Sequence, residues 1–592
     1  MIVLINPPVS EKAAFPVKCT WGLGCLKTFL SKNKIECVII DEKNIELTIQ
    51  KISELNKKVF LFGFTAMSYQ INSALRLASY IKKKFPDSHV CFGGSAATGL
   101  KEKLLLNNSV DFVISGEGEI PLFTLYSCLK NGDNLGKVPA LFFKNSGKIN
   151  NNSFYNLLKP EELILAEREN LTDYGIFFDH SFREKTAFLM FSRGCPGKCR
   201  FCMSPKIFPS PARICSVDKA VSYIKNIIDK YDIKHFVIDD DNFMFFKDFV
   251  YEFAQKIRNF KIKFRINMSI INFDPELILE LKKSGLTKIS AGIETLSEKS
   301  CEIIHKKTDR KKLETISVFC KKNNILFSTL FMALLPGEGV EDFCENFNFV
   351  KKLNPSGGFD FQIFQPHPGT FSDAEIKKYG FLLTDNLDEY FSDNVVFLPE
   401  NIDIIYFEKI FSDKTGKAIS IAGKNEKSLL EIYKNNSNAI IINPENFRAD
   451  FNIECYHWTG SENCSTGLSI IKCRDYGFIE YDFSISNSEN KYVLIFRGAS
   501  HPIGFPEGDE FGSVVNIYMN NKLISTEFFP SIHTIGKLFE IPVLNVIKGK
   551  NTLKFEISYQ AKFKNGFSIF NKALSPFYKK YETGIILKTV EC

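Results

Sequence analysis

The chain has 592 residues, of which 44% are hydrophobic and 24% charged, and these ordinary globular proportions argue against extensive disorder. Its length suits about three or four domains, each with its own core. The net charge of +7 is spread over many lysines, which favours a solvated surface over a nucleic-acid groove. No stretch approaches the roughly 18 apolar residues of a membrane-spanning helix, and residues 1–7 lack the basic region of a signal peptide. We therefore expect a cytoplasmic protein that binds neither membrane nor nucleic acid, with its 16 cysteines used as thiols and metal ligands rather than in disulfides.

The first 150 residues alternate between short apolar runs and segments of helical spacing, such as residues 72–84. This pattern predicts a doubly wound α/β domain over residues 1–150, because parallel strands buried on both faces are short and continuously apolar. The expected strands are residues 2–5, 37–40, 59–62, 90–92 and 112–114.

Small and turn-forming residues follow these expected strands at their carboxyl ends. Ligands of doubly wound sheets bind at that edge, and glycine lets the backbone approach a large flat ligand closely. The pattern predicts a generic cofactor site; the alternative is that the loops merely turn. The candidate cofactor-binding residues are Asn6, Pro7, Thr65, Gly93, Gly94, Ser95, Gly116, Glu117, Gly118 and Glu119.

Three cysteines, Cys195, Cys199 and Cys202, form a C-x3-C-x2-C run. Such a loop can gather three thiolates around one iron–sulfur cluster, whereas an ordinary ferredoxin closes its cluster with four cysteines. One iron would then stay open to a substrate or cosubstrate, which is typical of a catalytic centre. A zinc site with an unseen fourth ligand and idle thiols are the alternatives.

Gly-Cys-Pro at the first cysteine and Phe201 between the last two complete a motif that closely resembles the radical S-adenosylmethionine (SAM) enzymes. The resemblance implies a 4Fe-4S cluster whose open iron chelates the amino and carboxylate groups of SAM. It also implies an external electron donor of the flavodoxin or ferredoxin type, since the reduced cluster must pass an electron to the sulfonium and release a 5'-deoxyadenosyl radical.

Residues 180–385 have the pattern of the radical core, which in that family is a partial barrel of six β/α units with its chemistry at the carboxyl ends of the strands. We expect Ser216 to cap one helix, and Asp274-Pro275 with Gly285 to bracket another. The expected strands are residues 187–191, 235–238, 264–268, 288–293, 326–332 and 359–364.

Polar residues and one glycine lie at or beyond the ends of these strands. By resemblance, Asp239 and Asp241 contact the SAM amine, since an ammonium needs acceptors; a solvated turn or a hard-cation site is the alternative. Arg265 is expected to face the interior, and Glu294 matches a position near the SAM ribose or carboxylate in relatives. Gly337 matches the adenine loop of the family.

His367, after the last core strand, could reach the active cavity, although a structural histidine is an equally good interpretation.

The N-terminal domain resembles the cobalamin-binding domain that precedes many radical SAM cores. The resemblance rests on a strand ending in Asn-Pro-Pro, on Gly22-Leu23-Gly24, on Gly93-Gly94 and on residues 110–119. The Asp-x-His-x-x-Gly motif that supplies a lower cobalt ligand elsewhere is absent, because Phe92 stands where the glycine should be. We therefore interpret His89 as a turn residue and expect the lower face of cobalamin to lack a protein histidine.

Together these resemblances predict a cobalamin-dependent radical SAM methyltransferase that acts on an unactivated carbon, through a 5'-deoxyadenosyl radical and methylcobalamin. The main alternative is a radical SAM enzyme for cyclisation, rearrangement or oxidation, with cobalamin or a vestigial cobalamin site. A carbohydrate-recognition or scaffold protein with a dormant core is a third possibility, which the intact cysteine motif disfavours.

The last third changes character. Residues 386–434 are expected to be a helical linking segment, and residues 435–592 an all-β sandwich with strands at 439–442, 476–485, 492–496, 514–519 and 551–557. The sandwich resembles carbohydrate-binding jelly rolls, so the substrate is expected to be a small or glycosylated molecule. Tyr456, His457 and Trp458 could stack on a sugar, although packing is the more ordinary role of such aromatics. Cys455, Cys464 and Cys473 are too widely spaced to indicate a second cluster.

Overall fold

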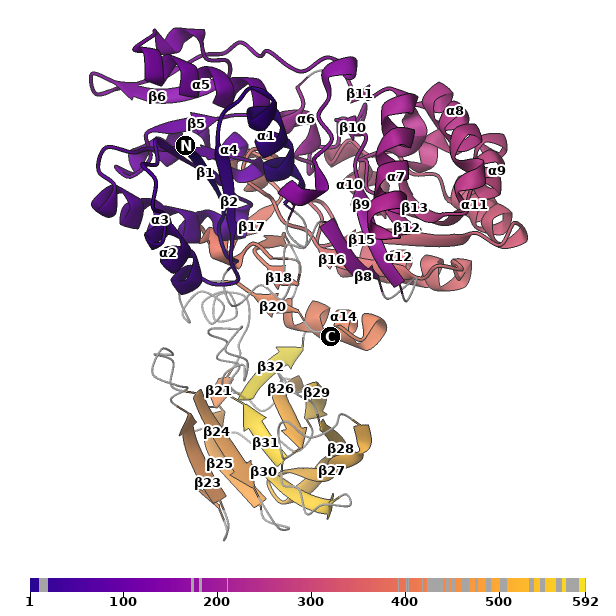
Figure 1. The fold of residues 1–592 in the computed structure, drawn as a ribbon. Helices are drawn as coiled ribbons and strands as arrows, with labels where there is room; N and C mark the ends of the chain where they lie inside the picture. Colours follow the sequence, from indigo (N-terminus) through magenta and orange to yellow (C-terminus); the bar gives the residue numbers. More distant parts are fainter. Residues whose placement is uncertain are drawn as a thin grey trace. The chain divides into compact units, whose positions relative to one another are not determined.

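The computed structural model describes residues 1–9, 20–171, 175–179, 184–209, 211–391, 393–400, 402, 404–417 and 419–422, and beyond these the strands β21 to β32 with the turn between β27 and β28. The chain divides into two compact units, Met1–Ile404 and Ile405–Cys592. Each unit is described by itself (Figure 1). Within the described residues, no helix has the length and apolar character needed to cross a membrane.

The N-terminal sheet has seven strands in the order β2-β1-β3-β4-β5-β6-β7. The first five are parallel and the last two antiparallel, and this order places the topological switch point between β1 and β3. The strands are β1 Ile2–Asn6, β2 Cys37–Asp41, β3 Leu61–Thr65, β4 His89–Gly93, β5 Phe112–Ile114, β6 Leu141–Asn145 and β7 Lys148–Asn151.

Helices cover both faces of this sheet, because successive residues of its strands point to opposite sides. On β1, Val3 and Ile5 belong to one core cluster, whereas Ile2 and Leu4 belong to another. The first cluster contains residues of α2 and α3, and the second contains residues of α1 and α5. The helices are α1 Trp21–Lys32, α2 Ile45–Ser53, α3 Ile71–Lys84, α4 Ser95–Leu100 and α5 Glu119–Asn131.

The core sheet also has seven strands, in the order β16-β15-β14-β13-β12-β9-β8. β9 and β12 to β16 are parallel and neighbour one another in chain order, and β8 pairs with β9 antiparallel. The strands are β8 Ile176–Asp179, β9 Glu184–Leu189, β12 His235–Ile238, β13 Lys263–Met268, β14 Leu286–Glu294, β15 Leu326–Ala333 and β16 Phe359–Ile363. This order is that of the expected β/α units; closure into a partial barrel stays a prediction.

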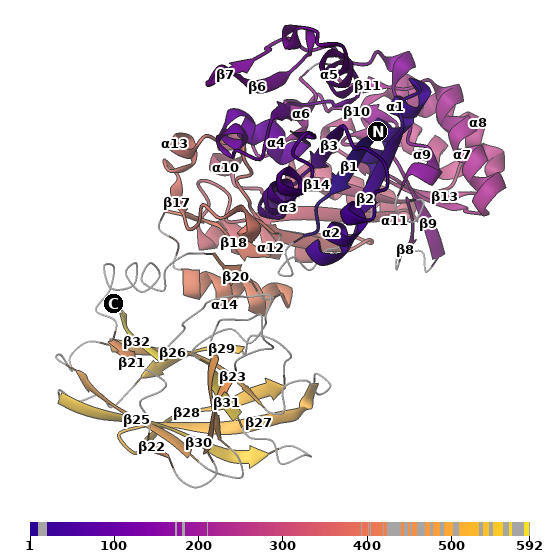
Figure 2. The ribbon, with the colours of Figure 1, turned by 60° about the vertical axis from the view of Figure 1, so that its left-hand side comes forward.

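Helices α7, α8, α9 and α11 lie along one side of the core sheet (Figure 2). Their ends follow the expected signals: Ser216 accepts a hydrogen bond from the backbone N–H of Lys219, and Asp274 accepts one from Leu277. Gly285 has φ +110°, and a Cβ there would lie 2.0 Å from the Ile262 carbonyl oxygen. The helices are α7 Val217–Tyr231, α8 Lys247–Ile257, α9 Pro275–Lys283, α10 Glu298–Ile303, α11 Arg310–Lys322 and α12 Val340–Leu353.

Short elements complete the first unit. The helical linking segment expected over residues 386–434 contains the helix α14 Ile404–Thr415, but also the short strands β18 Asn394–Val395 and β19 Phe397–Pro399, of which β19 pairs with β17. A strand of two or three residues is too short to show an alternation of apolar and polar side chains, and it therefore leaves no periodic signal in the sequence. The others are β10 Ser192–Arg193, α6 Ser204–Ile207, β11 Arg213–Ile214, α13 Asp373–Ile376 and β17 Gly380–Leu382.

The second unit begins with α14 (Ile405 onward in the helix Ile404–Thr415) and continues with strands. Five strands form the sheet β22-β25-β30-β27-β28, and the other sheet runs β21-β32-β26-β31-β24-β23 with β29 beside β26. Residues 423–439 and Cys464 lie outside the described residues, and of Tyr456, His457 and Trp458 only the backbone is described. The strands are β20 Ser420–Ile421, β21 Ile440–Ile442, β22 Arg448–Ala449, β23 Ile453–Trp458, β24 Leu468–Cys473, β25 Phe478–Ile485, β26 Lys491–Ser500, β27 Gly508–Met519, β28 Lys522–Ser531, β29 Lys537–Val543, β30 Gly549–Gln560, β31 Phe567–Phe570 and β32 Ile585–Val590.

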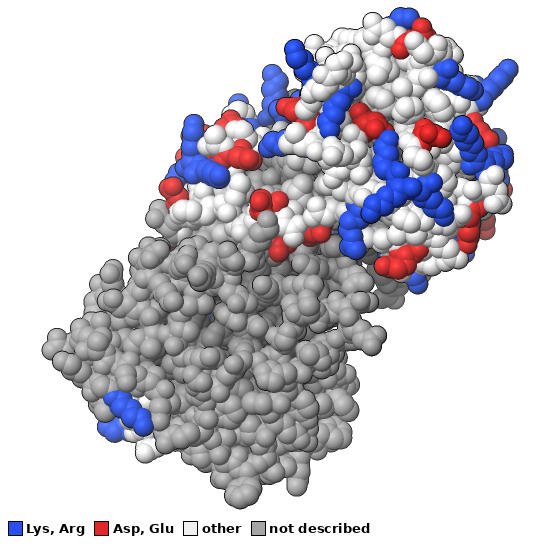
Figure 3. Space-filling model, turned by 90° about the vertical axis from the view of Figure 1, so that its left-hand side faces the viewer, with Lys and Arg blue, Asp and Glu red and all other residues white. Residues whose placement is uncertain are grey.

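Charged side chains of both signs are interspersed on the face shown in Figure 3, over the part that is not grey. Acidic groups lie among the lysines and arginines there, as expected for a solvated surface.

Candidate active site

The three cysteines lie on the loop between β10 and β11, where Ser192 and Arg193 pair with Ile214 and Arg213. The loop leaves β10 through Gly194, whose φ of +83° favours glycine. All three thiols are partly exposed. The Gly197 N–H donates to the Cys195 Sγ and the Ser204 N–H to the Cys202 Sγ, each at 3.4 Å. Such N–H donors stabilise thiolates, the form that binds iron.

Burial raises the pKa of all three thiols, that of Cys202 to about 11, and the positive charge of Lys306 opposes this at Cys195 and Cys199. Among the residues that the structure describes, no three His, Cys, Asp or Glu side chains converge on a position for one metal ion. The three cysteines as ligands of an iron–sulfur cluster stay a prediction.

Asp240 fixes the start of the cluster loop, a role that the sequence did not reveal. Its fully buried carboxylate accepts hydrogen bonds from the Phe191 N–H at 3.0 Å and from both the N–H and the hydroxyl of Ser192. Burial raises its pKa to about 6, although these donors favour the charged form. A buried carboxylate with three donors orients the backbone three residues before Cys195.

The two flanking aspartates form hydrogen bonds with Ser204 of the cluster loop and with Asn267 of β13. Asp241 accepts a hydrogen bond from the Ser204 hydroxyl at 2.5 Å, and its charge raises the pKa of Cys195 and Cys202. Asp239 accepts one from the Asn267 amide at 2.6 Å, and the charge of Arg265 lowers its pKa against the larger effect of burial. The structure thus brings Asp239, Asp241 and Arg265 to one edge; their contacts to SAM stay predictions.

Glu294 ends β14 in the left-handed conformation, with φ +69°, and Lys306 lies 3.5 Å from its Oε1. Burial raises the pKa of Glu294, and Lys306 lowers it. Lys306 acts on both Glu294 and the cluster thiols, and sequence reasoning missed it because a lysine in a basic run gives no signal. The pair is suited to the polar end of a zwitterionic ligand such as SAM.

Gly337 has φ +87°, and a Cβ there would lie 2.7 Å from the Cδ1 of Ile303. The next residue, Glu338, is buried and accepts a hydrogen bond from the Leu335 N–H at 3.0 Å, and burial raises its pKa to about 8. This carboxyl closes the turn that carries Gly337. Its role in holding adenine stays a prediction.

On the N-terminal sheet, Asn6 and Pro7 are held by a buried glutamine that the sequence did not single out. The Gln70 amide donates to the Asn6 Oδ1 at 3.0 Å and to the Pro7 carbonyl at 2.6 Å, and Asn6 donates to Asp41 at 2.9 Å. These bonds occupy the Asn6 side chain and order the carboxyl end of β1.

The loop after β4 passes closely over the end of β3. Gly94 has φ +89°, and a Cβ there would lie 2.7 Å from the Thr65 Oγ1. Gly93 ends β4, and Ser95 begins α4 directly after this turn. Thr65, Gly93, Gly94 and Ser95 therefore form one edge of small residues beside the switch point, which suits a flat ligand.

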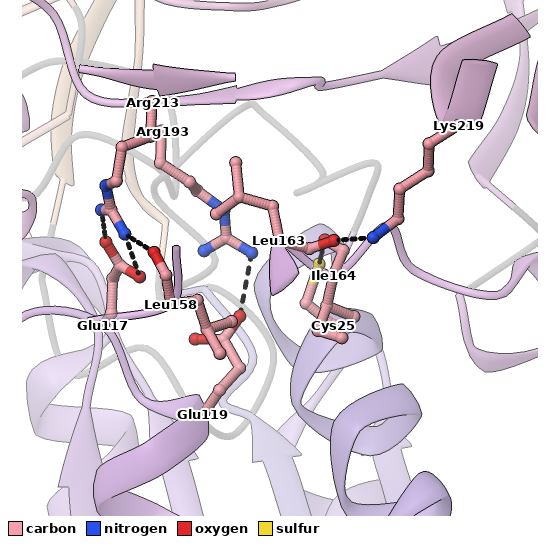
Figure 4. A network of polar contacts seen from close by, with 9 residues as sticks. All are labelled: Cys25, Glu117, Glu119, Leu158, Leu163, Ile164, Arg193, Arg213 and Lys219. Atoms are coloured by element: carbon pink, nitrogen blue, oxygen red, sulfur yellow. Dashed lines mark hydrogen bonds and ion pairs between the residues drawn. The ribbon is translucent and has the colours of Figure 1, made fainter. Parts of the chain in front are cut away.

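The side chains of Glu117 and Glu119 point toward Arg213 and Arg193, which lie at the two ends of the cluster loop (Figure 4). Glu117 forms an ion pair with Arg213, and the Glu119 Oε1 lies 2.8 Å from the Arg193 guanidinium. A Cβ on Gly116 would lie 2.9 Å from the Ile207 carbonyl oxygen, and one on Gly118 3.1 Å from Leu26. Both carboxylates are thus paired with arginines, and the cofactor contacts expected of Gly116 to Glu119 stay predictions.

The carboxyl edges of the two sheets meet at two further points. Ser68, after β3, is 3.0 Å from the Nδ1 of His367, after β16. A Cβ on Gly99 of α4 would lie 2.0 Å from the Pro368 carbonyl oxygen. Burial lowers the pKa of His367 to about 4, so the ring is neutral at physiological pH. The expected cofactor edges therefore face each other.

His89 and Gly24 have structural roles that differ from those expected from the sequence. His89 is not a turn residue: it begins β4, at the amino edge of the sheet, with its ring 5.3 Å from Phe60 and 5.7 Å from Phe112. This position leaves it away from the carboxyl edge of the sheet. Gly24 serves close packing, since a Cβ there would lie 2.4 Å from Leu171.

Comparison with known proteins agrees with this geometry. Residues 189–350 match the model of the radical SAM superfamily. An uncharacterised methyltransferase of Pyrococcus horikoshii is 26% identical over 380 residues, which are 62% of this chain and 81% of that protein. The anaerobic magnesium-protoporphyrin IX monomethyl ester cyclase of Rubrivivax gelatinosus is 23% identical over 355 residues, which are 57% of this chain and 62% of the cyclase.

Two solved structures share the fold. The radical SAM methyltransferase TsrM of Kitasatospora setae, with cobalamin and a [4Fe-4S] cluster bound, has a TM-score of 0.50 at 14% identity and covers 62% of this chain and 73% of its own. The cobalamin-dependent radical SAM enzyme OxsB, in its apo form, has a TM-score of 0.53 at 14% identity, and the match covers 69% of this chain and 67% of the OxsB chain. The predicted radical SAM domain is confirmed over residues 189–350, and much of the chain shares its fold with the two cobalamin-dependent enzymes TsrM and OxsB.

Proposed function

We propose that this protein is a cobalamin-dependent radical SAM methyltransferase acting on an unactivated carbon. The observation that carries the proposal is the meeting of two carboxyl edges, one bearing the cluster cysteines and the other the small-residue turns of the N-terminal sheet. An ordinary nucleophilic methyl transfer needs neither a cluster nor cobalt, so both together imply a carbon that cannot act as a nucleophile.

The chain's own residues would hold the cofactors in the following way. Cys195, Cys199 and Cys202 would bind the cluster, with Lys306 offsetting its negative charge. Asp239 and Asp241 would accept hydrogen bonds from the SAM amine. When bound, the cofactors supply a hydrogen-abstracting radical and a methyl group.

Further residues would complete both cofactor sites. Glu294 and the turn at Gly337 would bind the rest of SAM. The edge formed by Thr65 and Gly93 to Ser95 would support cobalamin.

The substrate is proposed to be a small molecule, and the reducing electron to come from a flavodoxin or ferredoxin. The second unit, if it forms the predicted sandwich, would present or select the substrate, including a glycosylated one. Its sequence shows no metal-ligand spacing, and we assign it no step in the chemistry.

A radical cyclase, rearrangement or oxidation enzyme is the second candidate. It is favoured by the relative from Rubrivivax gelatinosus, whose name is that of a cyclase. The two candidates differ in what happens to the methyl group of SAM.

An experiment without substrate separates them. The protein is reconstituted anaerobically with iron, sulfide and cobalamin, reduced, and incubated with SAM. The methyltransferase proposal predicts formation of S-adenosylhomocysteine that requires cobalamin, beside formation of 5'-deoxyadenosine. Formation of 5'-deoxyadenosine alone, with no S-adenosylhomocysteine, would favour the second candidate.

A further inference from the structure

The cluster loop is closed at its base by the β10–β11 ribbon. Arg193 pairs with Arg213 across this ribbon, so these two arginines stand at the start and the end of the loop that carries the three cysteines. Anything that moves the two arginines moves both ends of the loop together.

One turn of the N-terminal domain holds both arginines (Figure 4). Glu119 binds Arg193 at 2.8 Å, and Glu117 binds Arg213 through both of its carboxylate oxygens. Arg213 also donates to the Leu158 carbonyl of the connecting segment. The two glutamates are separated by one residue: Glu117 lies in the turn between β5 and α5, and Glu119 is the first residue of α5.

Both pairs are shielded from water, which distinguishes them from ordinary surface pairs. The side chains of Arg193 and Glu119 are 11% and 3% exposed, and those of Arg213 and Glu117 are 10% and 3% exposed. Because an unpartnered charge at such a site is unfavourable, each arginine is confined to the position of its carboxylate. Gly116 adds a third fixed point, since it lies against the Ile207 carbonyl of the same loop.

We infer that Glu117 and Glu119 are positioning residues that fix the cluster loop to the cofactor edge of the N-terminal sheet and so set the placement of the cluster relative to cobalamin. The inference rests on the proposed function for its cobalamin part, but the anchoring of the loop stands on the contacts alone. These glutamates act through the two arginines with which they pair.

Hydrogen exchange of the apo protein tests the anchoring without cofactors. The double variant Glu117→Gln/Glu119→Gln keeps the side-chain shape and removes both negative charges. We expect exchange in residues 194–212 to rise about tenfold or more, because the loop opens locally when its arginines lose their partners. Exchange in β12 and β13 should stay within about twofold of the parent.

Glu345→Gln is the matched control, because its partner Arg310 lies in an exposed pair of the core, with side chains 45% and 57% exposed. It should leave exchange in the cluster loop unchanged. Unchanged exchange in the double variant would overturn the anchoring. A uniform rise across residues 1–404 would also overturn it, since the pairs would then hold the fold generally.

A second measurement tests the placement of the cofactors. In the parent protein with reduced cluster and cob(II)alamin, the paramagnetic cluster should shorten the spin-relaxation time of cob(II)alamin. We expect this enhancement to fall several-fold in the double variant while iron and cobalamin contents stay near those of the parent. An unchanged enhancement contradicts the inference. A parent that binds no cobalamin refutes the proposed function instead, and leaves the exchange result to decide the anchoring.

Discussion

At the residue scale, the run Asp239-Asp240-Asp241 shows that adjacent identical side chains can have different roles. Successive side chains point in alternate directions as the chain leaves β12. The Asp240 carboxylate is therefore buried behind the start of the cluster loop, whereas Asp239 and Asp241 point the other way, toward Asn267 and Ser204. The sequence predicted the outer two as ligands. Applying the same alternation to the middle one would have predicted its structural role.

A cysteine substitution series tests the cluster ligands. Cys195→Ala, Cys199→Ala and Cys202→Ala should each abolish the cluster absorption and all SAM cleavage, because two thiolates cannot hold the cluster in the required geometry. Absorption spectra, iron content and 5'-deoxyadenosine formation measure this.

Cys215→Ala and Cys301→Ala are the matched controls. Cys215 is buried, and the Cys301 Sγ is hydrogen-bonded to the Thr295 carbonyl and to the Thr308 hydroxyl. Both variants should keep the cluster. Loss of the cluster in Cys215→Ala would make it a fourth ligand, and the open iron on which the radical chemistry depends would disappear.

His367 predicts a pH dependence of stability. Burial lowers its pKa to about 4, below the value of an unfolded histidine, so the folded state resists protonation. Its contribution is complete above about pH 6.5 and is lost as the pH falls towards 4, by roughly 2–3 kcal/mol. Urea unfolding of the parent and of His367→Asn at several pH values should show this slope only in the parent.

The control for this series is His305→Asn, since His305 is exposed and its φ of +54° suits asparagine. His305→Asn should keep the slope of the parent between pH 6.5 and 4. Equal slopes in the parent and in His367→Asn would show that His367 is protonated without cost.

At the element scale, sequence patterning predicted most of the first unit. The strands β1 to β5, the cap at Ser216 and the bracket at Asp274 and Gly285 follow from local signals. Short strands such as β18 and β19 were missed, because two or three residues show no period. Lys306 and Gln70 were missed because their partners are set only by the folded chain.

Gly99 allows α4 to lie close to the loop after β16, and its substitution tests this close approach. In Gly99→Ala the new Cβ would lie 2.0 Å from the Pro368 carbonyl oxygen, so either α4 or the loop after β16 must move. We expect a loss of about 1–3 kcal/mol in unfolding free energy. Thermal or urea unfolding measures it.

Gly22→Ala in α1 is the matched control, because a Cβ there meets nothing within 4 Å. It should be neutral or stabilising by up to about 1 kcal/mol, as alanine favours a helix over glycine. If Gly99→Ala were as stable as Gly22→Ala, the close approach of α4 to the loop after β16 would be wrong.

At the scale of the whole molecule, the sequence predicted two cofactor domains but not how they meet. Glu117 and Arg213 are 96 residues apart in sequence, and Ser68 and His367 are 299 apart. No local pattern links such residues, so the Gly-Glu-Gly-Glu segment was interpreted as a cofactor loop, whereas its carboxylates bind the arginines of the cluster loop.

The cofactor content of the purified protein tests the central claim most directly. After anaerobic reconstitution with iron, sulfide and cobalamin and removal of unbound cofactors, the chain should show both cluster absorption and a cob(II)alamin spectrum, in equal amounts. A chain that carries the cluster and cleaves SAM but retains no cobalamin would contradict the account, because the two facing edges would then hold only one cofactor.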